Sequence, residues 1–138
     1  MLDQTDMNIL KELSKNSRMT MKALGEKVHL TGQAAANRVM KLEDEGIIQK
    51  YTISIDWHAE QLIQTFIHIF TTSYNHKPLL SFLDGAEEMK KLYKISGEGC
   101  YMAECYFSSH DELDHFLTDL SQYANYKLSI VVKRIIHE

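Results

Sequence analysis

The chain has 138 residues, of which 44% are hydrophobic and 25% are charged, a globular composition in which two domains would both have to be small. No apolar run approaches the roughly 18 to 20 residues that cross a membrane, and the acidic N-terminus is unlike a signal peptide, so we expect a cytoplasmic protein without membrane contacts. The net charge of -4 argues against nucleic-acid binding through bulk positive charge, and Cys100 and Cys105 form no CxxC motif and are expected to be free thiols.

The acidic balance comes entirely from the second part of the chain. Residues 1–56 contain eight basic and eight acidic side chains, so the net negative charge of the chain comes from the remaining residues. A neutral segment can still bind DNA if its basic groups share one face, and dimerisation doubles the phosphate contacts. The charge pattern therefore permits DNA binding without specifying it.

Three short helices are predicted in the first part of the chain. The first helix is capped by Asp3 and ends at residues 16–18. The second helix begins after Thr20, and the third begins after Thr31 and ends at Gly46. Apolar residues recur at helical spacing in all three segments. The positions expected to face a common core are Met7, Ile9, Leu10, Leu13, Met21, Leu24, Val28, Ala35, Val39 and Leu42.

After the third helix the apolar period changes from about 3.6 residues to 2. Residues 47–48 and 51–55 are expected to form two short strands around Gln49 and Lys50. Together these strands would make a wing. The following segment, 57–64, contains Trp57 and is the predicted linker.

The second part of the chain alternates strand and helix patterns. The order of elements is a strand over 65–72, a helix over 78–88, strands over 91–96 and 100–107, a helix over 111–121 and a long strand over 126–136. This βαββαβ order predicts a ferredoxin-like domain. The predicted fold class is thus α+β, with a winged helix-turn-helix over 1–56 and a ferredoxin-like domain over 65–138.

Two helices on one face of such a sheet leave its other face open. Depending on the parity of the strands, that face carries apolar residues such as Phe66, Phe70, Met102 and Ile135. An exposed apolar patch of this kind indicates a binding partner.

The third helix is the candidate DNA reader. Only about three residues, 28–31, join it to the second helix, which forces the steep crossing that lets a reader enter a major groove. Gln33, Asn37 and Lys41 recur every four residues and share a stripe; amides can contact adenine, whereas basic groups can contact guanine or phosphate. The residues predicted to bind DNA are Arg18, Lys22, Thr31, Gln33, Ala34, Asn37, Arg38, Lys41 and Lys50.

The sequence carries several motifs of a known family. LDQTDMNIL, the NSR turn, LGEKVHL and RVMKLEDEGII resemble the N-terminal signature of the Lrp/AsnC, or feast/famine, regulators. KLYKISGEGCYM is similar to the glycine-bearing turn of that family's ligand-sensing domain. The resemblance covers residues 1 to 136, and its N-terminal motifs are highly specific.

The resemblance implies a homodimer, commonly built up into tetramers or octamers, that binds double-stranded DNA on the nucleoid. It also implies an amino acid or other small effector, held by Ser96, Gly97, Glu98, Gly99, Cys100 and Tyr101, in a C-terminal domain that oligomerises. Cys100 stands where many relatives have an acid that pairs with an α-amino group, and a thiol cannot supply that charge. Glu98 is the nearest acid that could substitute.

Catalysis, a cofactor and a metal site are not expected. His110 and His115 are five residues apart, outside the spacing that lets two imidazoles on one helix share a metal, and no GxSxG motif occurs. Two alternatives remain open. One is a small-molecule-binding ferredoxin-like protein whose helical part serves assembly, and the other is a DNA-compacting protein of low sequence preference, which the small residues over 32–36 would favour.

Overall fold

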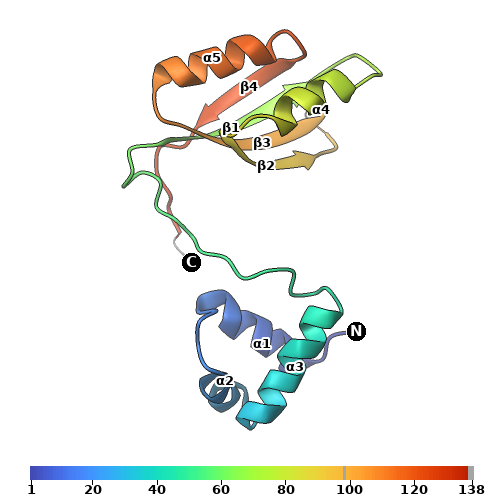
Figure 1. The fold of residues 1–138 in the computed structure, drawn as a ribbon, viewed down its shortest axis with the longest axis vertical. Coiled ribbons are helices and arrows are strands. Elements are labelled where there is room, and N and C mark those ends of the chain that lie inside the picture. The colour runs from blue at the N-terminus through green and yellow to red at the C-terminus, as the bar shows by residue number, and fades with distance from the viewer. Residues whose placement is uncertain (98, 137–138) are drawn as a thin grey trace. The chain divides into compact units, whose positions relative to one another are not determined.

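The computed structural model describes residues 1–97 and 99–136, which fall into two compact units (Figure 1). The helical unit, residues 1–54, contains α1 (Gln4–Lys15), α2 (Met21–Val28) and α3 (Gly32–Asp44). The sheet unit, which begins at Ile55, contains β1 (Ile63–Phe70), α4 (Lys77–Asp84), β2 (Met89–Lys94), β3 (Tyr101–Phe107), α5 (His110–Leu120) and β4 (Asn125–Ile130). Among the helices of the described residues, none has the length and apolar character needed to cross a bilayer.

Side-chain caps define where the first three helices begin. The Asp6 amide donates to Asp3 Oδ1 at 2.8 Å, and the Asp3 amide donates back to Asp6 Oδ2 at 3.3 Å, which is a capping box. Thr20 and Thr31 each accept the amide hydrogen three residues ahead, both at 3.1 Å. The three predicted helix starts are therefore confirmed.

The three helices of the helical unit share one apolar core. Its buried members are Ile9, Leu13, Leu24, Val28, Ala35, Val39 and Leu42. Met7 was predicted to join them but is 50% exposed, because Asp6, Ile9 and Leu13 form the buried stripe of α1 and turn Met7 toward solvent. Leu10 and Met21 are only partly buried at the edge of this core.

The connection between α2 and α3 depends on a close backbone approach. His29 ends α2 in the left-handed region at φ 61°, and the next amide, that of Leu30, donates to Gly25 O at 2.8 Å. A Cβ on Gly25 would lie 2.5 Å from Leu30 O, so only glycine lets the turn pack this closely on α2. This contact makes the predicted short turn possible.

The predicted wing does not form in the single chain. Residues 47–56, all of which are described, are in no strand. The amides of Ile47 and Ile48 both donate to Leu42 O, at 2.9 and 3.1 Å, so these residues close the end of α3 instead of starting a strand. Ile53 is exposed, because a period-2 pattern needs a sheet partner that this segment lacks within one chain.

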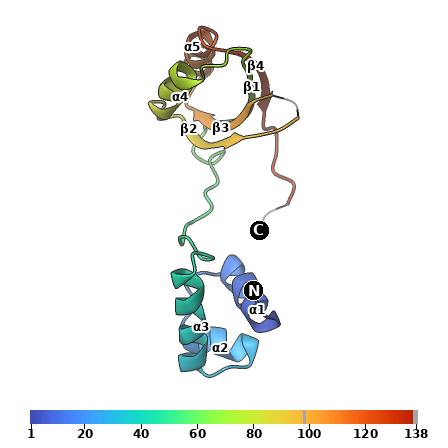
Figure 2. The ribbon, with the colours of Figure 1, turned by 90° about the vertical axis from the view of Figure 1, so that its right-hand side faces the viewer.

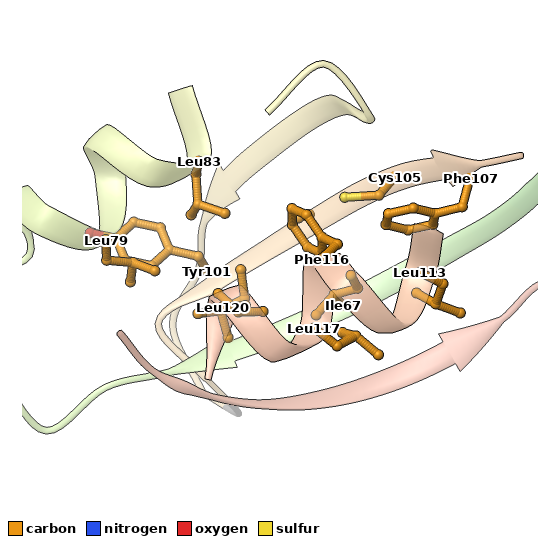
Figure 3. Close-up of a cluster of buried hydrophobic side chains, with 12 residues drawn as sticks. Ile67, Leu79, Leu83, Tyr101, Cys105, Phe107, Leu113, Phe116, Leu117 and Leu120 are labelled. Atoms are coloured by element: carbon orange, nitrogen blue, oxygen red, sulfur yellow. The ribbon is translucent and has the colours of Figure 1, made fainter. Parts of the chain in front are cut away.

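The sheet unit has the predicted ferredoxin-like order. Its four strands are arranged β2-β3-β1-β4 with antiparallel neighbours, and α4 and α5 lie on one face (Figures 1 and 2). Alternate residues of the central strands point into a core with the two helices (Figure 3). The buried members are Ile67, Ile69, Leu79, Leu83, Tyr101, Ala103, Cys105, Phe107, Leu113, Phe116, Leu117 and Leu120.

Two predicted elements of the sheet unit are shorter than expected. α4 ends at Asp84, with Gly85 as its C-cap, and residues 86–88 turn into β2. β4 ends at Ile130, and the Val131 amide makes a last bond to Gln64 O at 2.9 Å. Because β1 begins at Ile63, no partner remains for residues 132–136, so Ile135 is outside the sheet and not on its open face.

Candidate nucleic-acid interface

α3 presents a polar row on the side opposite its buried residues. Because Ala35, Val39 and Leu42 face the core, the exposed side chains of Gln33, Asn37 and Lys41 are aligned along the other side. Gln33 Nε2 donates to Asn37 Oδ1 at 3.1 Å, and Lys41 forms an ion pair with Glu45 at 3.9 Å. The prediction that these three side chains point outward is confirmed.

The amide pair on this row retains groups that suit a base edge. Its internal hydrogen bond occupies one Gln33 N–H and the Asn37 oxygen, which leaves the Gln33 oxygen and the Asn37 amide group available. The major-groove edge of adenine offers one acceptor and one donor, which is complementary to one amide donor and one amide acceptor. The row can therefore make base contacts, with a lysine at its end for guanine or phosphate.

Arg38 lies beside this row but points elsewhere. Its Nη1 atom lies 2.5 Å from Asp3 Oδ2 and 3.2 Å from Asp6 Oδ1, at the N-terminus of α1. The pKa of Asp3 is lowered, first by the hydrogen bond from the Asp6 amide and then by that from Arg38, and the same carboxylates raise the pKa of Arg38. Sequence patterns did not reveal this contact, because the partners are 32 and 35 residues away.

The other basic residues predicted to contact DNA are exposed. Arg18 lies in the turn after α1, where its amide donates to Asn16 Oδ1 at 3.0 Å, and Lys22 lies in the first turn of α2. Lys50 follows α3 on the extended segment. These three cations form no ion pair with any residue of the described part of the chain, so they are available to phosphate groups. Thr31 serves as the N-cap of α3, and Ala34 is half-buried.

The described residues among those predicted to hold an effector lie between β2 and the start of β3, at one end of the sheet. Ser96 and Gly97 are exposed, and Gly97 and Gly99 have φ values of 89° and 93°, which favour glycine. Glu98 lies outside the described residues. Cys100 is half-buried, with its thiol 3.6 Å from Thr71 O, while Tyr101 is buried.

The structure adds partners to that turn that the sequence did not indicate. The Tyr101 hydroxyl is 2.8 Å from His76 Nδ1, and the Cys100 amide donates to Ile69 O at 2.8 Å. These contacts join the turn to the end of β1 and to the segment that follows it. No sequence signal marked His76, which the structure places as the N-cap residue of α4.

The two cysteines are free, as predicted. Burial, followed by the nearby charges of Glu88 and Glu104, raises the pKa of the Cys105 thiol to about 12. That thiol is therefore protonated at neutral pH and unreactive. The described residues contain no cluster of His, Cys, Asp and Glu side chains able to hold a metal ion.

The face of the sheet opposite the helices is only half-buried along β1 and β3, and it carries apolar side chains among polar ones such as His68 and Glu104. Phe66, Phe70 and Met102 lie on this open face, as one parity of the strands predicted. Tyr106 lies on it too, with its ring 5.4 Å from that of Trp57. The Tyr106 hydroxyl donates to Glu104, and burial followed by this carboxylate raises the pKa of Tyr106.

Comparison with known proteins agrees with this architecture. Residues 2–49 match the family described as winged helix-turn-helix DNA-binding, and residues 64–138 match the Lrp/AsnC ligand binding domain. The chain is 48% identical over 134 residues to the HTH-type transcriptional regulator LrpA of Bacillus subtilis, covering 96% of this chain and 98% of the relative.

Two solved structures have the same fold over the whole chain. The structure of Bacillus subtilis LrpC has a TM-score of 0.90 and 29% identity, covering 100% of this chain and 99% of that chain. A transcriptional regulator of Neisseria meningitidis, solved as its L-Met complex, has a TM-score of 0.87 and 28% identity, covering 99% and 94%. The protein is thus a member of the Lrp/AsnC family of helix-turn-helix transcription regulators that bind DNA.

Proposed function

We propose that this regulator reads double-stranded DNA on the nucleoid with the exposed row of α3. Asn37 and Gln33 would contact base edges in the major groove, and Lys41 would contact guanine or phosphate. Arg18, Lys22 and Lys50 would contact the phosphates on either side. The observation that carries this proposal is the outward alignment of three side chains on a helix whose opposite side is fully packed.

Binding to the DNA upstream of the protein's own gene, measured across salt concentrations, tests this interface. We expect the logarithm of the affinity to fall linearly with the logarithm of salt, and Lys41→Gln to reduce the slope by about one. Lys77→Gln is the matched control, since Lys77 is equally charged and exposed but lies on α4. A slope unaffected by Lys41→Gln would contradict the proposed contact.

Specificity needs a separate variant. Asn37→Ala should lower the preference for the upstream DNA over random DNA by roughly 1 to 3 kcal/mol, the value of one good bidentate base contact. Equal affinity of the unmodified protein for both DNAs would instead indicate a compacting protein of low sequence preference.

A second copy of the chain is proposed as the partner of the open sheet face. That face is apolar at Phe66, Phe70 and Met102, and it also carries Lys91 opposite Glu104, so two copies related by a twofold axis can place unlike charges against each other. Small domains also gain stability from such contacts. Tetramers or octamers would be built from this dimer.

Light scattering tests the assembly. Phe66→Glu should reduce the mass in solution to that of one chain, because a charge would be buried without a partner. Leu80→Glu is the control, since Leu80 is an exposed apolar residue of α4 on the other side of the sheet unit. Circular dichroism of both variants must show the folded spectrum. A dimer that survives Phe66→Glu would contradict this interface.

A small effector, such as an amino acid, is proposed to bind beside Ser96, Gly97, Gly99, Cys100 and Tyr101. A solved relative carries L-Met, which supports this class of ligand. Here the Cys100 thiol is half-buried against a carbonyl and supplies no charge to an α-amino group. A thermal-shift screen of the amino acids should find a compound that raises Tm. A protein that ignores DNA but is stabilised by an amino acid would be a small-molecule-binding protein instead.

A further inference from the structure

Arg38 differs from the neighbouring cation of the same helix. The side chain of Lys41 is 68% exposed and pairs with Glu45 at the end of its own helix, whereas that of Arg38 is 35% exposed and bonds two carboxylates at the start of α1. Arg38 immediately follows Asn37, so it lies beside the middle of the proposed reading row, with its tip at the start of α1. Both hydrogen bonds come from Nη1, so the guanidinium charge of Arg38 is held beside two carboxylates.

The two carboxylates also have a structural task of their own. Asp3 and Asp6 form the capping box at the start of α1, and Asp6 is only 7% exposed. A carboxylate this deeply buried must be paired, because an isolated buried charge is very costly. Arg38 provides the opposite charge, and the helix N-terminus adds a favourable dipole. The three side chains therefore depend on one another.

This cluster links two helices at a point where their orientation matters. The apolar contacts of α3 run through one stripe of the helix, Ala35, Val39 and Leu42. Arg38 projects beside that stripe and is held at its tip by two oxygen atoms. A rotation of α3 would break both bonds, so the cluster restricts the direction in which Gln33 and Asn37 point.

We propose that Arg38 is a positioning residue of the DNA-binding surface, which holds α3 against the N-terminus of α1 and neutralises no DNA phosphate. This inference rests on the proposed function of α3 as the DNA reader. The role of Asp3 and Asp6 follows from this role of Arg38. Asp3 and Asp6 support DNA binding, although carboxylates near DNA are ordinarily repulsive.

Removal of the Asp3 carboxylate tests the proposal through the direction in which DNA affinity changes. Asp3→Asn keeps a good helix cap but loses the charge that pairs with Arg38. If Arg38 were a phosphate contact, this change would free it and raise DNA affinity. Positioning predicts the opposite, a fall of roughly tenfold, the size expected when one base contact is misplaced. Asp44→Asn is the control, because Asp44 is an exposed acid of α3 outside the cluster, and its loss should not weaken binding.

The salt dependence provides the second readout. Arg38→Gln should also lower affinity about tenfold yet leave the slope of log affinity against log salt unchanged, whereas a lost phosphate contact lowers that slope by about one. All affinities are measured well below Tm, with folding verified by circular dichroism, so a residue that only stabilised the fold would leave them unchanged. A reduced slope for Arg38→Gln, or tighter binding by Asp3→Asn, would overturn the proposal.

A measurement without DNA separates this inference from the proposed function. The Tm values of Arg38→Gln, Asp6→Asn and the double variant form a double-mutant cycle. The double variant should lower Tm by much less than the sum of the two single decreases. Additive losses would show that the cluster is not a unit and would overturn the inference. A coupled cluster in a protein that fails to bind DNA would instead reject α3 as the reader.

Discussion

The helical unit and the sheet unit each pack around one apolar core, but they expose different kinds of surface. In the helical unit the three helices share one core, and the side of α3 opposite that core is a row of amide and ammonium groups. In the sheet unit α4 and α5 cover one face, and the other face shows half-buried Phe66, Phe70 and Met102. The first surface suits a hydrated, charged partner, and the second suits another apolar protein surface.

β3 illustrates how one strand creates both environments. Its residues alternate between buried and half-buried positions, so Tyr101, Ala103, Cys105 and Phe107 build the core while Met102, Glu104 and Tyr106 form the open face. No comparable alternation exists in α3, where one stripe is packed and the row on the opposite side, Gln33, Asn37 and Lys41, is polar. The open face of the sheet is therefore a candidate protein interface, whereas the exposed row of α3 is a polar surface.

The largest expected effect distinguishes the two faces of the sheet. Phe107 is fully buried with its ring 5.4 Å from that of Phe116, so Phe107→Ala should reduce the free energy of unfolding by about 3 to 5 kcal/mol. Urea unfolding followed by circular dichroism measures this loss. Phe66→Ala, on the half-buried open face, should cost a single chain much less. Equal losses, measured at concentrations where the chain is monomeric, would contradict the distinction.

A smaller effect is expected at the tight turn of the helical unit. Gly25→Ala places a Cβ 2.5 Å from Leu30 O, so the turn must move, at a cost of about 1 to 3 kcal/mol. Gly32→Ala is the matched control, since its nearest new contact would be an ordinary 3.4 Å. Hydrogen exchange should report the loss in α1 to α3 and leave the sheet amides protected, because the two cores share no residue. Loss of protection in the sheet would contradict separate cores.

The helix caps should contribute equally in both units. The Thr31 hydroxyl accepts the Ala34 amide, and the Ser109 hydroxyl accepts the Glu112 amide, each at 3.1 Å. Thr31→Ala and Ser109→Ala should each lower the free energy of unfolding by about 1 kcal/mol. Thr31→Ser keeps the acceptor and should be nearly neutral in the same thermal-unfolding experiment. A large loss from Thr31→Ser would show that the methyl group, not the hydroxyl, stabilises this end of α3.

The smallest effects concern acid. Hydrogen bonds from the side chain and backbone of Ser108 lower the pKa of Glu112, while the Asp6 amide and then Arg38 lower that of Asp3. Each contribution to stability is therefore complete above the unfolded pKa of about 4 and is lost as pH falls through the lowered folded value. Unfolding free energies measured from pH 7 to pH 2 should be flat at first and then decline. Asp3→Asn should reduce the decline, and an unchanged profile would contradict the pairing of Asp3.

Local patterns predicted most of the elements and both cores. Caps at Asp3, Thr20 and Thr31 set helix starts through bonds that span three residues, and apolar spacing identified Ala35, Val39 and Leu42 as buried. Such signals are readable because cause and effect lie within one turn of a helix or along one strand. The exposed row of α3 followed from the same periodicity.

Several features that the sequence did not reveal depend on distant partners. Residues 47–56 alternate like strands, but a strand forms only where another supplies hydrogen bonds, and none does so within one chain. β4 ends at Ile130 because β1 begins at Ile63, a limit imposed by the partner strand.

The sequence alone thus determined the three-helix order of the first unit, the ferredoxin-like order of the second and the helix starts. It also determined the outward direction of Gln33, Asn37 and Lys41. The tertiary structure alone decided that Arg38 pairs with Asp3 and Asp6 and that Tyr101 bonds His76. The physical reason is that backbone hydrogen bonds and apolar stripes obey local periods, whereas the partner of a long polar side chain is set by where the packed helices and strands bring its tip.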